Sequence, residues 1–414
     1  MKAKKALKIS LIVLCSIILL FLICFLCWCL SFVIIGNTGL PRLDITTSEK
    51  ITSKEVYVDC TVSISNTDKE FELSEVEASI RGRGNSTWQY YPKKPYRIKF
   101  DKKTSLFGEE KNKSWVLLAM YNDYSRSKDA LAFSIAKSIG TDAFVPSYHY
   151  VDVYINGKYN GLYLLTDQVD ENKGRTGVEY DFSPSDTEVP FLIELDDHVD
   201  LEGTENIDWF YVGGLKYAIK YPKADERYTN EQFNYIKSYI ETVDRLSKKQ
   251  DVTIEELSEY IDIDSFIDYY LIQEIMIQAE VKYKSVFMSK SIDGKLKMGP
   301  VWDYDWSLGG PSITNYSHDT TGFVTEKTWF YKLYTNSDEF KELVVNRWNE
   351  IKDIVLECAD TFKAESKQIA KASTKDWLRW RWFIITGNYK RNLNKAIDTL
   401  KVRVEWLDRE FNKE

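Results

Sequence analysis

The sequence predicts an α+β protein of two lobes, a β-rich lobe followed by a helical one. Segments in which apolar and polar residues alternate, as they do in strands, fill the chain to about residue 222. Segments with the helical spacing of apolar residues dominate from about residue 223 to 414, with one β-hairpin inserted at residues 285–302. Strands followed by helices are typical of α+β folds, and the cleft between two lobes is their default ligand site.

The N-terminus carries a candidate membrane anchor. Four lysines lie in the first eight residues, and an uncharged apolar run follows over residues 9–35. The run is longer than the roughly 20 residues that a spanning helix needs and than the roughly 7–15 residues of a signal-peptide core. We expect residues 1–8 in the cytoplasm, a single-pass signal anchor at residues 9–35 in the cell membrane, and the rest outside the cytoplasm. A cleaved signal peptide is the alternative.

Behind the anchor, we expect a short linker at residues 36–54 and one domain at residues 55–414. The formal net charge of the chain is −8, and its four N-terminal lysines precede the apolar run, so the domain is more acidic still. This charge argues against nucleic acid as a partner. Four of the six cysteines lie in the apolar run, which leaves only Cys60 and Cys358 outside it and excludes a cysteine zinc site. We expect these two as buried free thiols, and one disulfide between them is the alternative.

Alternation and turn residues predict the strands in order. Asn156-Gly157 demands a tight turn, which makes residues 150–166 a hairpin. At residues 92–100, apolar side chains alternate with Arg97 and Lys99, so these two cations project from one face. Strands are expected at residues 55–64, 73–80, 92–100, 150–166, 191–196 and 217–222, and residues 115–120 form a strand or begin a helix.

Helical spacing with start and stop signals predicts the helices. Gly140 is placed to end the first, at residues 123–139. Thr229-Asn-Glu-Gln232 is a capping box for a helix that reaches about residue 246. The helix at residues 264–277 is strongly apolar, so we expect it to be buried. Further helices are expected at residues 254–260, 337–354 and 393–411.

Two carboxylates, Asp303 and Asp305, follow the inserted hairpin. Trp302, Tyr304 and Trp306 flank them and exclude water, and buried acidic groups are rarely found unless they are paired or hold a cation. At the end of a strand, their spacing places both carboxylates on one face, where their oxygens suit Mg²⁺. The alternative is a loop in which the aspartates cap a helix or pair with arginine.

The order of further polar residues along the chain fits phosphoryl transfer from a nucleotide. Arg81 and Arg83 alternate with two glycines, so guanidinium groups and backbone N–H groups can approach a phosphate, and Lys99 follows on the next strand. Glu280, in the loop after the apolar helix, can orient a nucleophile. The alternatives are a solvated turn and strand face, and a Glu280 that only pairs with a lysine such as Lys282.

Four motifs in this order resemble the CotH family of spore-coat kinase-like proteins, over residues 75–348. The motifs are Arg81-Gly-Arg-Gly-Asn-Ser-Thr-Trp88, Lys93-Lys-Pro-Tyr-Arg-Ile-Lys99, Ile155-Asn-Gly-Lys-Tyr-Asn-Gly-Leu-Tyr163 and Gly299-Pro-Val-Trp-Asp-Tyr-Asp305. The resemblance implies an atypical protein-kinase-like fold that phosphorylates Ser or Thr of coat proteins with ATP and Mg²⁺. It implies a metal aspartate at Asp303 or Asp305 and cleft cations at Arg83 and Lys99.

The chain departs from the family pattern at two places. Many members carry Asn-x-Asp, with the Asp as base, where this chain has Gln278-Ala-Glu280. Members often carry Glu-Gln after the Asn-Gly hairpin, where this chain has Asp167-Gln168. Both replacements keep the charge, so we expect Glu280 among the catalytic residues with Asp303, and Asp167 among the cofactor-binding residues with Arg81.

The leading hypothesis is therefore a membrane-anchored, extracytoplasmic kinase that binds ATP and Mg²⁺ and acts on Ser or Thr of a protein substrate. A non-catalytic surface or assembly protein on the same fold is the second, favoured by Glu280 and by the scarcity of ATP outside cells. A glycosyltransferase that uses Asp303 and Asp305 is less favoured, because the sequence lacks the long α/β alternation of a nucleotide-sugar-binding domain.

Overall fold

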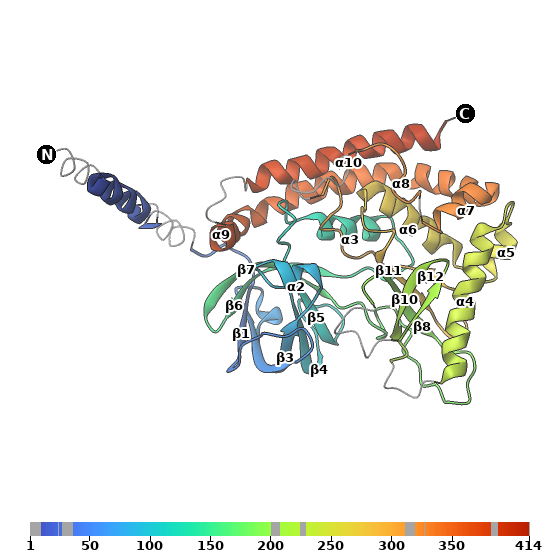
Figure 1. Ribbon diagram of the computed structural model, residues 1–414, viewed down its shortest axis with the longest axis horizontal. Helices are drawn as coiled ribbons and strands as arrows, with labels where there is room; N and C mark the ends of the chain where they lie inside the picture. The colour runs from blue at the N-terminus through green and yellow to red at the C-terminus, as the bar shows by residue number, and fades with distance from the viewer. Residues whose placement is uncertain are drawn as a thin grey trace.

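Two separate sheets and a layer of helices form the body of the protein (Figure 1). The computed structural model describes residues 10–23, 25–26, 36–199, 208–223, 229–310, 319–326, 328–381 and 388–413. Within these ranges, the chain is α+β as the sequence predicts, with strands dominating its first part and helices its second.

The first sheet is a closed barrel whose strands follow the order β1-β2-β3-β4-β5-β7-β6. Alternate side chains such as Ile98 and Phe100 fill its interior, and both are buried. The strands are β1 (Arg42–Thr46), β2 (Val58–Ser65), β3 (Leu73–Gly82), β4 (Tyr96–Thr104), β5 (Asn112–Leu118), β6 (Tyr148–Ile155) and β7 (Lys158–Asp167).

β1 corrects the expected linker at residues 36–54. It pairs antiparallel with β2 and parallel with β6, and so it closes the barrel. Leu43 and Ile45 point into the barrel and are completely buried. A strand this short shows only two inward apolar residues, which is too little alternation to distinguish it from a linker.

The second sheet has the strand order β12-β11-β8-β10-β9. It consists of β8 (Phe191–Asp196), β9 (Trp209–Val212), β10 (Leu215–Tyr221), β11 (Lys284–Lys290) and β12 (Lys297–Met298). β11 pairs antiparallel with β8, so that Met288 faces Ile193. The strands from 191 to 221 therefore belong with the inserted hairpin and not with the barrel. Residue 222 still separates a strand-rich from a helix-rich part of the chain, as expected, but the second sheet takes strands from both parts, because alternation predicts strands but not their partners.

Helices cover the top of both sheets (Figure 1). Long helices α8 and α10 pack side by side there, with α3 and α6 beneath them. The buried helix and the capping box of Thr229 and Gln232 are confirmed in α6 and α4. The helices are α2 (Ser86–Tyr90), α3 (Lys128–Ser138), α4 (Asn230–Lys248), α5 (Ile254–Ser258), α6 (Ile263–Met276), α7 (Tyr331–Asn336), α8 (Asp338–Glu365), α9 (Ala370–Arg381) and α10 (Tyr389–Phe411).

α9 connects the helical layer to the barrel through buried charges. The carboxylate of Asp376 lies 2.7 Å from Nζ of Lys93 and 2.9 Å from Nη2 of Arg126. It also accepts a hydrogen bond from the backbone N–H of Leu162 in β7. Gly161 makes this approach possible, because its φ is +130° and a Cβ there would lie 2.4 Å from Oδ1 of Asp376.

Residues 10–23 form a helix with exposed apolar side chains that extends from the body (Figure 1). Among the residues that the structure describes, no helix has both the length and the apolar composition needed to cross a membrane. Part of the expected anchor, at residues 9, 24 and 27–35, lies outside the described residues.

Candidate active site

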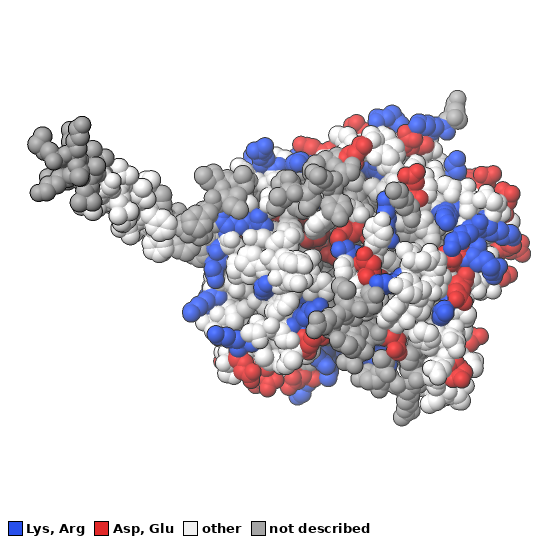
Figure 2. Space-filling model, in the orientation of Figure 1, with Lys and Arg blue, Asp and Glu red and all other residues white. Residues whose placement is uncertain are grey.

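A cleft of about 1050 Å³ lies between the barrel and the second sheet. The barrel contributes the turn after β3 and the link from β5 to α3. The second sheet contributes the end of β8, the start of β11 and the loop after β12. Figure 2 shows acidic and basic side chains together near the centre of the face of the molecule that is drawn there. Six carboxylates line the cleft, from Asp129, Glu194, Asp196, Glu280, Asp303 and Asp305.

Asp303 and Asp305 both line this cleft, although they do not leave the end of a strand. β12 ends at Met298, and Asp303 has a φ of +66°, in the left-handed region that non-glycine residues rarely adopt. Two contacts hold it there. The hydroxyl of Ser285 donates to Oδ2 of Asp303 at 3.0 Å, and the side-chain amide of Gln278 donates to its carbonyl oxygen at 2.6 Å.

A third carboxylate, Asp129 at the start of α3, lies against the same loop. Its Oδ1 accepts a hydrogen bond of 2.7 Å from the backbone N–H of Tyr304, between the two aspartates. Burial, with the charge of Asp303, raises the pKa of Asp129 to about 7. Burial and Asp303 likewise hold the pKa of Asp305 well above its usual range. Sequence reasoning missed Asp129, because an acidic residue in the first turn of a helix is common without a further role.

The three carboxylates take no salt bridge from a lysine or arginine in the described parts of the chain. Neighbouring negative charges without partners are unfavourable in a partly buried site, and this is the condition that a divalent cation relieves. The carboxylate oxygens are also the donors that Mg²⁺ prefers. Asp303 and Asp305 therefore offer carboxylates that suit a divalent cation. Among the described residues, the group of three whose possible ligand atoms all lie within 4.8 Å of one another is Asp196, Asp197 and His198.

Glu280 lines the same cleft as Asp303. Oε1 of Glu280 lies 2.6 Å from Nζ of Lys284, so its partner is Lys284 and not Lys282. Burial, followed by the charge of Asp303, raises the pKa of Glu280, and Lys284 acts against that rise. Sequence reasoning placed Glu280 in the cleft correctly and did not identify Lys284, which lines it as well.

Of the expected phosphate-binding cations, the structure brings only Arg83 into the cleft. Its guanidinium lies over the ring of Trp302, 5.5 Å from the ring centroid, and Asp303 and Asp129 are among the charges that act on it. Arg81 is stacked over Tyr57 instead and does not line the cleft. Gly82 between them has no room for a Cβ, which would lie 2.3 Å from the ring of Trp88.

Lys99 is exposed on the outside of the barrel and does not line the cleft. In the ladder between β3 and β4, Gly82 pairs with Tyr96 and Ser79 pairs with Lys99. The cleft adjoins the start of β4, at Pro95, so Lys99 lies further along the strand than the site. Alternation predicted the outward face of Lys99 correctly but not its distance from the cleft.

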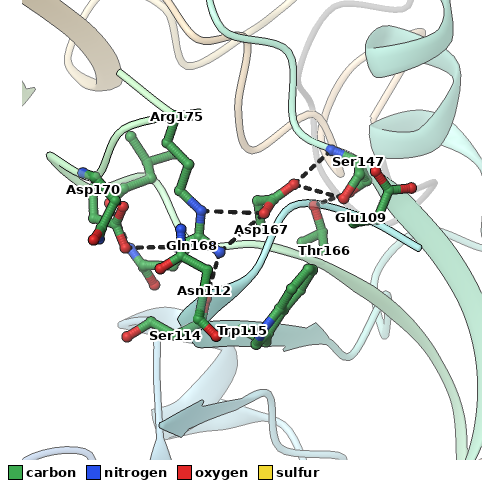
Figure 3. Close-up of polar contacts among 12 residues, drawn as sticks. Glu109, Asn112, Ser114, Trp115, Ser147, Thr166, Asp167, Gln168, Asp170 and Arg175 are labelled. Atoms are coloured by element: carbon green, nitrogen blue, oxygen red, sulfur yellow. Dashed lines mark hydrogen bonds and ion pairs between the residues drawn. The ribbon is translucent and has the colours of Figure 1, made fainter. Parts of the chain in front are cut away.

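Asp167 is also outside the cleft, in a network of its own (Figure 3). Oδ1 accepts from Nη2 of Arg175 at 2.9 Å, and Oδ2 accepts from the hydroxyl and the backbone N–H of Ser147 at 2.6 and 2.9 Å. Arg175 also binds Asp170 at 2.6 Å. Both carboxylate oxygens of Asp167 are therefore engaged in joining the end of β7 to neighbouring loops. This structural role replaces the cofactor-binding role that we expected from the sequence.

These features define a two-lobed α+β protein with an acidic cleft suited to a divalent cation and with Arg83 beside it. Comparison with protein families then identifies the particular family. The family described as CotH kinase protein matches residues 80–407, a range that includes Arg83, Glu280 and Asp303. The chain belongs to the CotH kinase family, so the resemblance found in the sequence is confirmed. No curated protein matches the chain. Membership of a kinase-like family indicates ATP and a divalent metal as ligands.

Proposed function

We propose that the protein is a kinase that transfers the γ-phosphate of ATP to Ser or Thr of a protein substrate, with Mg²⁺ as cofactor. The observation that carries the proposal is the convergence of Asp303, Asp305 and Glu280 with Arg83 in one cleft. The carboxylates of Asp303 and Asp305, which form no salt bridge with a described lysine or arginine, can bind the cation. The guanidinium of Arg83 can bind phosphate oxygens.

Each residue has a distinct part in this proposal. Asp303 and Asp305 carry the metal ligands, and Ser285 and Gln278 keep Asp303 in position. Arg83 binds phosphate oxygens and orients them. A bound Mg²⁺ would neutralise part of the triphosphate charge. Because phosphoryl transfer needs little covalent chemistry from the protein, this positioning provides most of the rate enhancement.

Glu280 accepts the proton of the substrate hydroxyl. Its pair with Lys284 favours the ionised carboxylate, which a base requires, but also weakens this carboxylate as a proton acceptor. The proposal therefore requires Nζ of Lys284 to move partly toward the phosphates when the nucleotide is bound. Lysine has a long flexible stem, so this movement needs no change in the backbone.

A second function, non-catalytic assembly at the cell surface or spore coat, is favoured by the same pair. A Glu280 held by Lys284 at 2.6 Å is a structural ion pair if no substrate displaces it. In that case the chain keeps the fold of the family and binds its partner without phosphoryl transfer.

The test is incubation of the purified protein with γ-labelled ATP and Mg²⁺, alone and with Ser-rich or acidic carrier proteins. We expect label on serine or threonine, lowered by roughly 100-fold or more in Asp303→Asn. Asp59→Asn, on the exposed surface of β2, is the control and should keep the activity. Equal labelling by wild type and Asp303→Asn contradicts the kinase proposal. If the wild type is folded and transfers no label to itself or to the carrier proteins, the result favours the assembly function.

We also propose that residues 9–35 anchor the protein in the cell membrane with its domain outside the cytoplasm. The support is the uncharged apolar run behind four lysines. Protease added to intact protoplasts should remove the domain, and alkaline carbonate should leave the protein in the membrane fraction. Protection of the domain, or its release by carbonate, contradicts this topology.

A further inference from the structure

Two arginines lie directly opposite each other on the outer face of the barrel. Arg81 in β3 pairs with Arg97 in β4, and both are half-buried. Their neighbours Ile80 and Ile98 fill the interior of the barrel, so the arginine side chains point outward. Residues paired in this way have Cβ atoms roughly 4.5–5.5 Å apart, and like charges there repel each other. The pair therefore lowers stability unless an anion neutralises it.

No carboxylate in the described part of the chain forms a salt bridge with either arginine of this pair. Two carboxylates of the loop after β7, those of Asp170 and Glu171, act on the charge of Arg97 from nearby. Both already have other partners. Asp170 lies 2.6 Å from Nη1 of Arg175. Glu171 lies 2.6 Å from Nζ of Lys223. The positive charge of the arginine pair is therefore not balanced by the acidic side chains around it.

Each guanidinium group also carries a buried donor that the described residues leave unsatisfied. Nε of Arg81 and Nε of Arg97 have almost no exposure to solvent and donate to no described atom. Nη2 of Arg97 donates to the hydroxyl of Ser114 at 3.0 Å, and the guanidinium of Arg81 lies over the ring of Tyr57, 5.0 Å from its centroid. Buried donors are nearly always satisfied by the protein, a water or an ion. Charge and hydrogen bonding thus both indicate an anionic acceptor.

We propose that Arg81 and Arg97 form a binding site for a phosphate group, separate from the nucleotide cleft, which neither residue lines. A phosphate dianion balances two guanidinium charges, whereas a carboxylate balances one. Its oxygens also match the planar N–H forks of arginine. Burial lowers the pKa of Arg97, and the charge of Arg81 acts in the same direction, yet arginine stays protonated in proteins. The inference does not depend on the proposed kinase activity.

Calorimetric titration of inorganic phosphate into the full-length protein, at constant ionic strength, tests the site. We expect Arg97→Gln to raise the dissociation constant of phosphate about tenfold or more, because a charge-assisted contact is lost. Lys99→Gln is the matched control. It removes one positive charge from the same face of β4, at an exposed side chain, and should change the constant by less than about twofold. Phosphate should also raise the unfolding temperature of the wild type more than that of Arg97→Gln.

Arg81→Gln is the second variant and should weaken phosphate binding as strongly, so the test holds even if Arg97→Gln does not fold. An effect of the arginine variants no larger than that of Lys99→Gln overturns the site, because it shows only general attraction to positive charge. Absence of phosphate binding in the wild type overturns it too. Phosphate binding should persist when a non-hydrolysable ATP analogue and Mg²⁺ are present, and displacement by the analogue would overturn a separate site.

The phosphate group can be free or carried by a protein side chain, and a phosphoserine peptide distinguishes these sources. Binding of the peptide that is tighter than that of inorganic phosphate, and that is lost in Arg97→Gln, supports the site and assigns it to a phosphorylated protein. Equal or weaker binding of the peptide, with inorganic phosphate still bound through Arg97, supports the site and assigns it to free phosphate. Equal binding of the unphosphorylated peptide to the wild type and to Arg97→Gln is the control.

Discussion

The hydroxyl of Ser285 donates a hydrogen bond of 3.0 Å to Oδ2 of Asp303, and both residues have a positive φ, of 60° and 66°. Two non-glycine residues in the left-handed region each cost of the order of 1–3 kcal/mol, and such conformations persist where the surroundings impose them, often at functional sites. The contact fixes which oxygen of Asp303 is engaged and which is available. It links the start of β11 to the loop after β12.

Ser285→Ala should therefore weaken binding of a divalent cation without abolishing it. Loss of the hydrogen bond frees the carboxylate of Asp303 to rotate, and outer contacts of this kind change metal affinity by about 10–100-fold. Isothermal titration with Mn²⁺ measures the change. Ser289→Ala on the same strand is the control, and an effect as large there would show that the cause is disruption of β11 and not the contact with Asp303.

The rate of phosphoryl transfer should fall at low pH because Glu280 becomes protonated, and this fall is the acid limb of the pH–rate profile. Burial and Asp303 raise its pKa, and a base works only when deprotonated, so kcat/KM should fall as the pH drops through that raised pKa. Lys284 lowers the pKa of Glu280, so Lys284→Met should move the limb to higher pH. Lys282→Met keeps the Glu280–Lys284 pair and should leave the limb in place. A limb that stays fixed or moves to lower pH in Lys284→Met would show that Glu280 is not the base.

Arg83 and Lys99 should differ in their effect on nucleotide affinity. Arg83 lines the cleft, so Arg83→Ala should raise the dissociation constant of Mg-ATP about tenfold, the cost of a lost charge-assisted contact. Lys99→Ala should change it by less than about twofold, because the side chain is exposed and solvent and salt screen its charge. Calorimetric titration of both variants distinguishes them. Equal losses would mean that Lys99 reaches the nucleotide.

Asp167→Ala should lower stability and leave nucleotide affinity unchanged. It removes a buried partner of Arg175, at a cost of about 3 kcal/mol, which is at the lower end for such pairs because Asp170 still binds the guanidinium. Denaturant unfolding measures the loss. Ser147→Ala removes only a hydrogen bond to the same carboxylate and should cost about 1 kcal/mol. Loss of ATP binding in folded Asp167→Ala would restore the cofactor-binding role expected from the sequence.

Sequence reasoning succeeded where the signal is local. Aromatic residues flanking Asp303 and Asp305 predicted a partly buried acidic pair, and the apolar helix before Glu280 predicted that this loop reaches the site. Both are in the cleft. The capping box of α4 and the turn at Asn156-Gly157 are likewise encoded within a few residues.

Prediction from the sequence failed where the position of a residue depends on contacts with residues far away in the chain. Asp129 meets Tyr304 across about 175 residues, and nothing in the first turn of α3 indicates that contact. Lys99 was assigned to the cleft from its strand face, although the register with Ser79 places it away from the site. β1 belongs to the barrel because it pairs with β2 and β6, and its own short sequence does not indicate this pairing.

The central claim is that the carboxylates of Asp303 and Asp305 bind a divalent cation together with ATP in the cleft. Calorimetric titration of ATP into the purified protein, with Mg²⁺ and with EDTA, tests it most directly. The account predicts saturable binding of ATP that depends on Mg²⁺ and is lost in the double variant Asp303→Asn, Asp305→Asn, while thermal unfolding of that variant stays cooperative. Binding of ATP that is equal with EDTA, or that survives in the folded double variant, would contradict it.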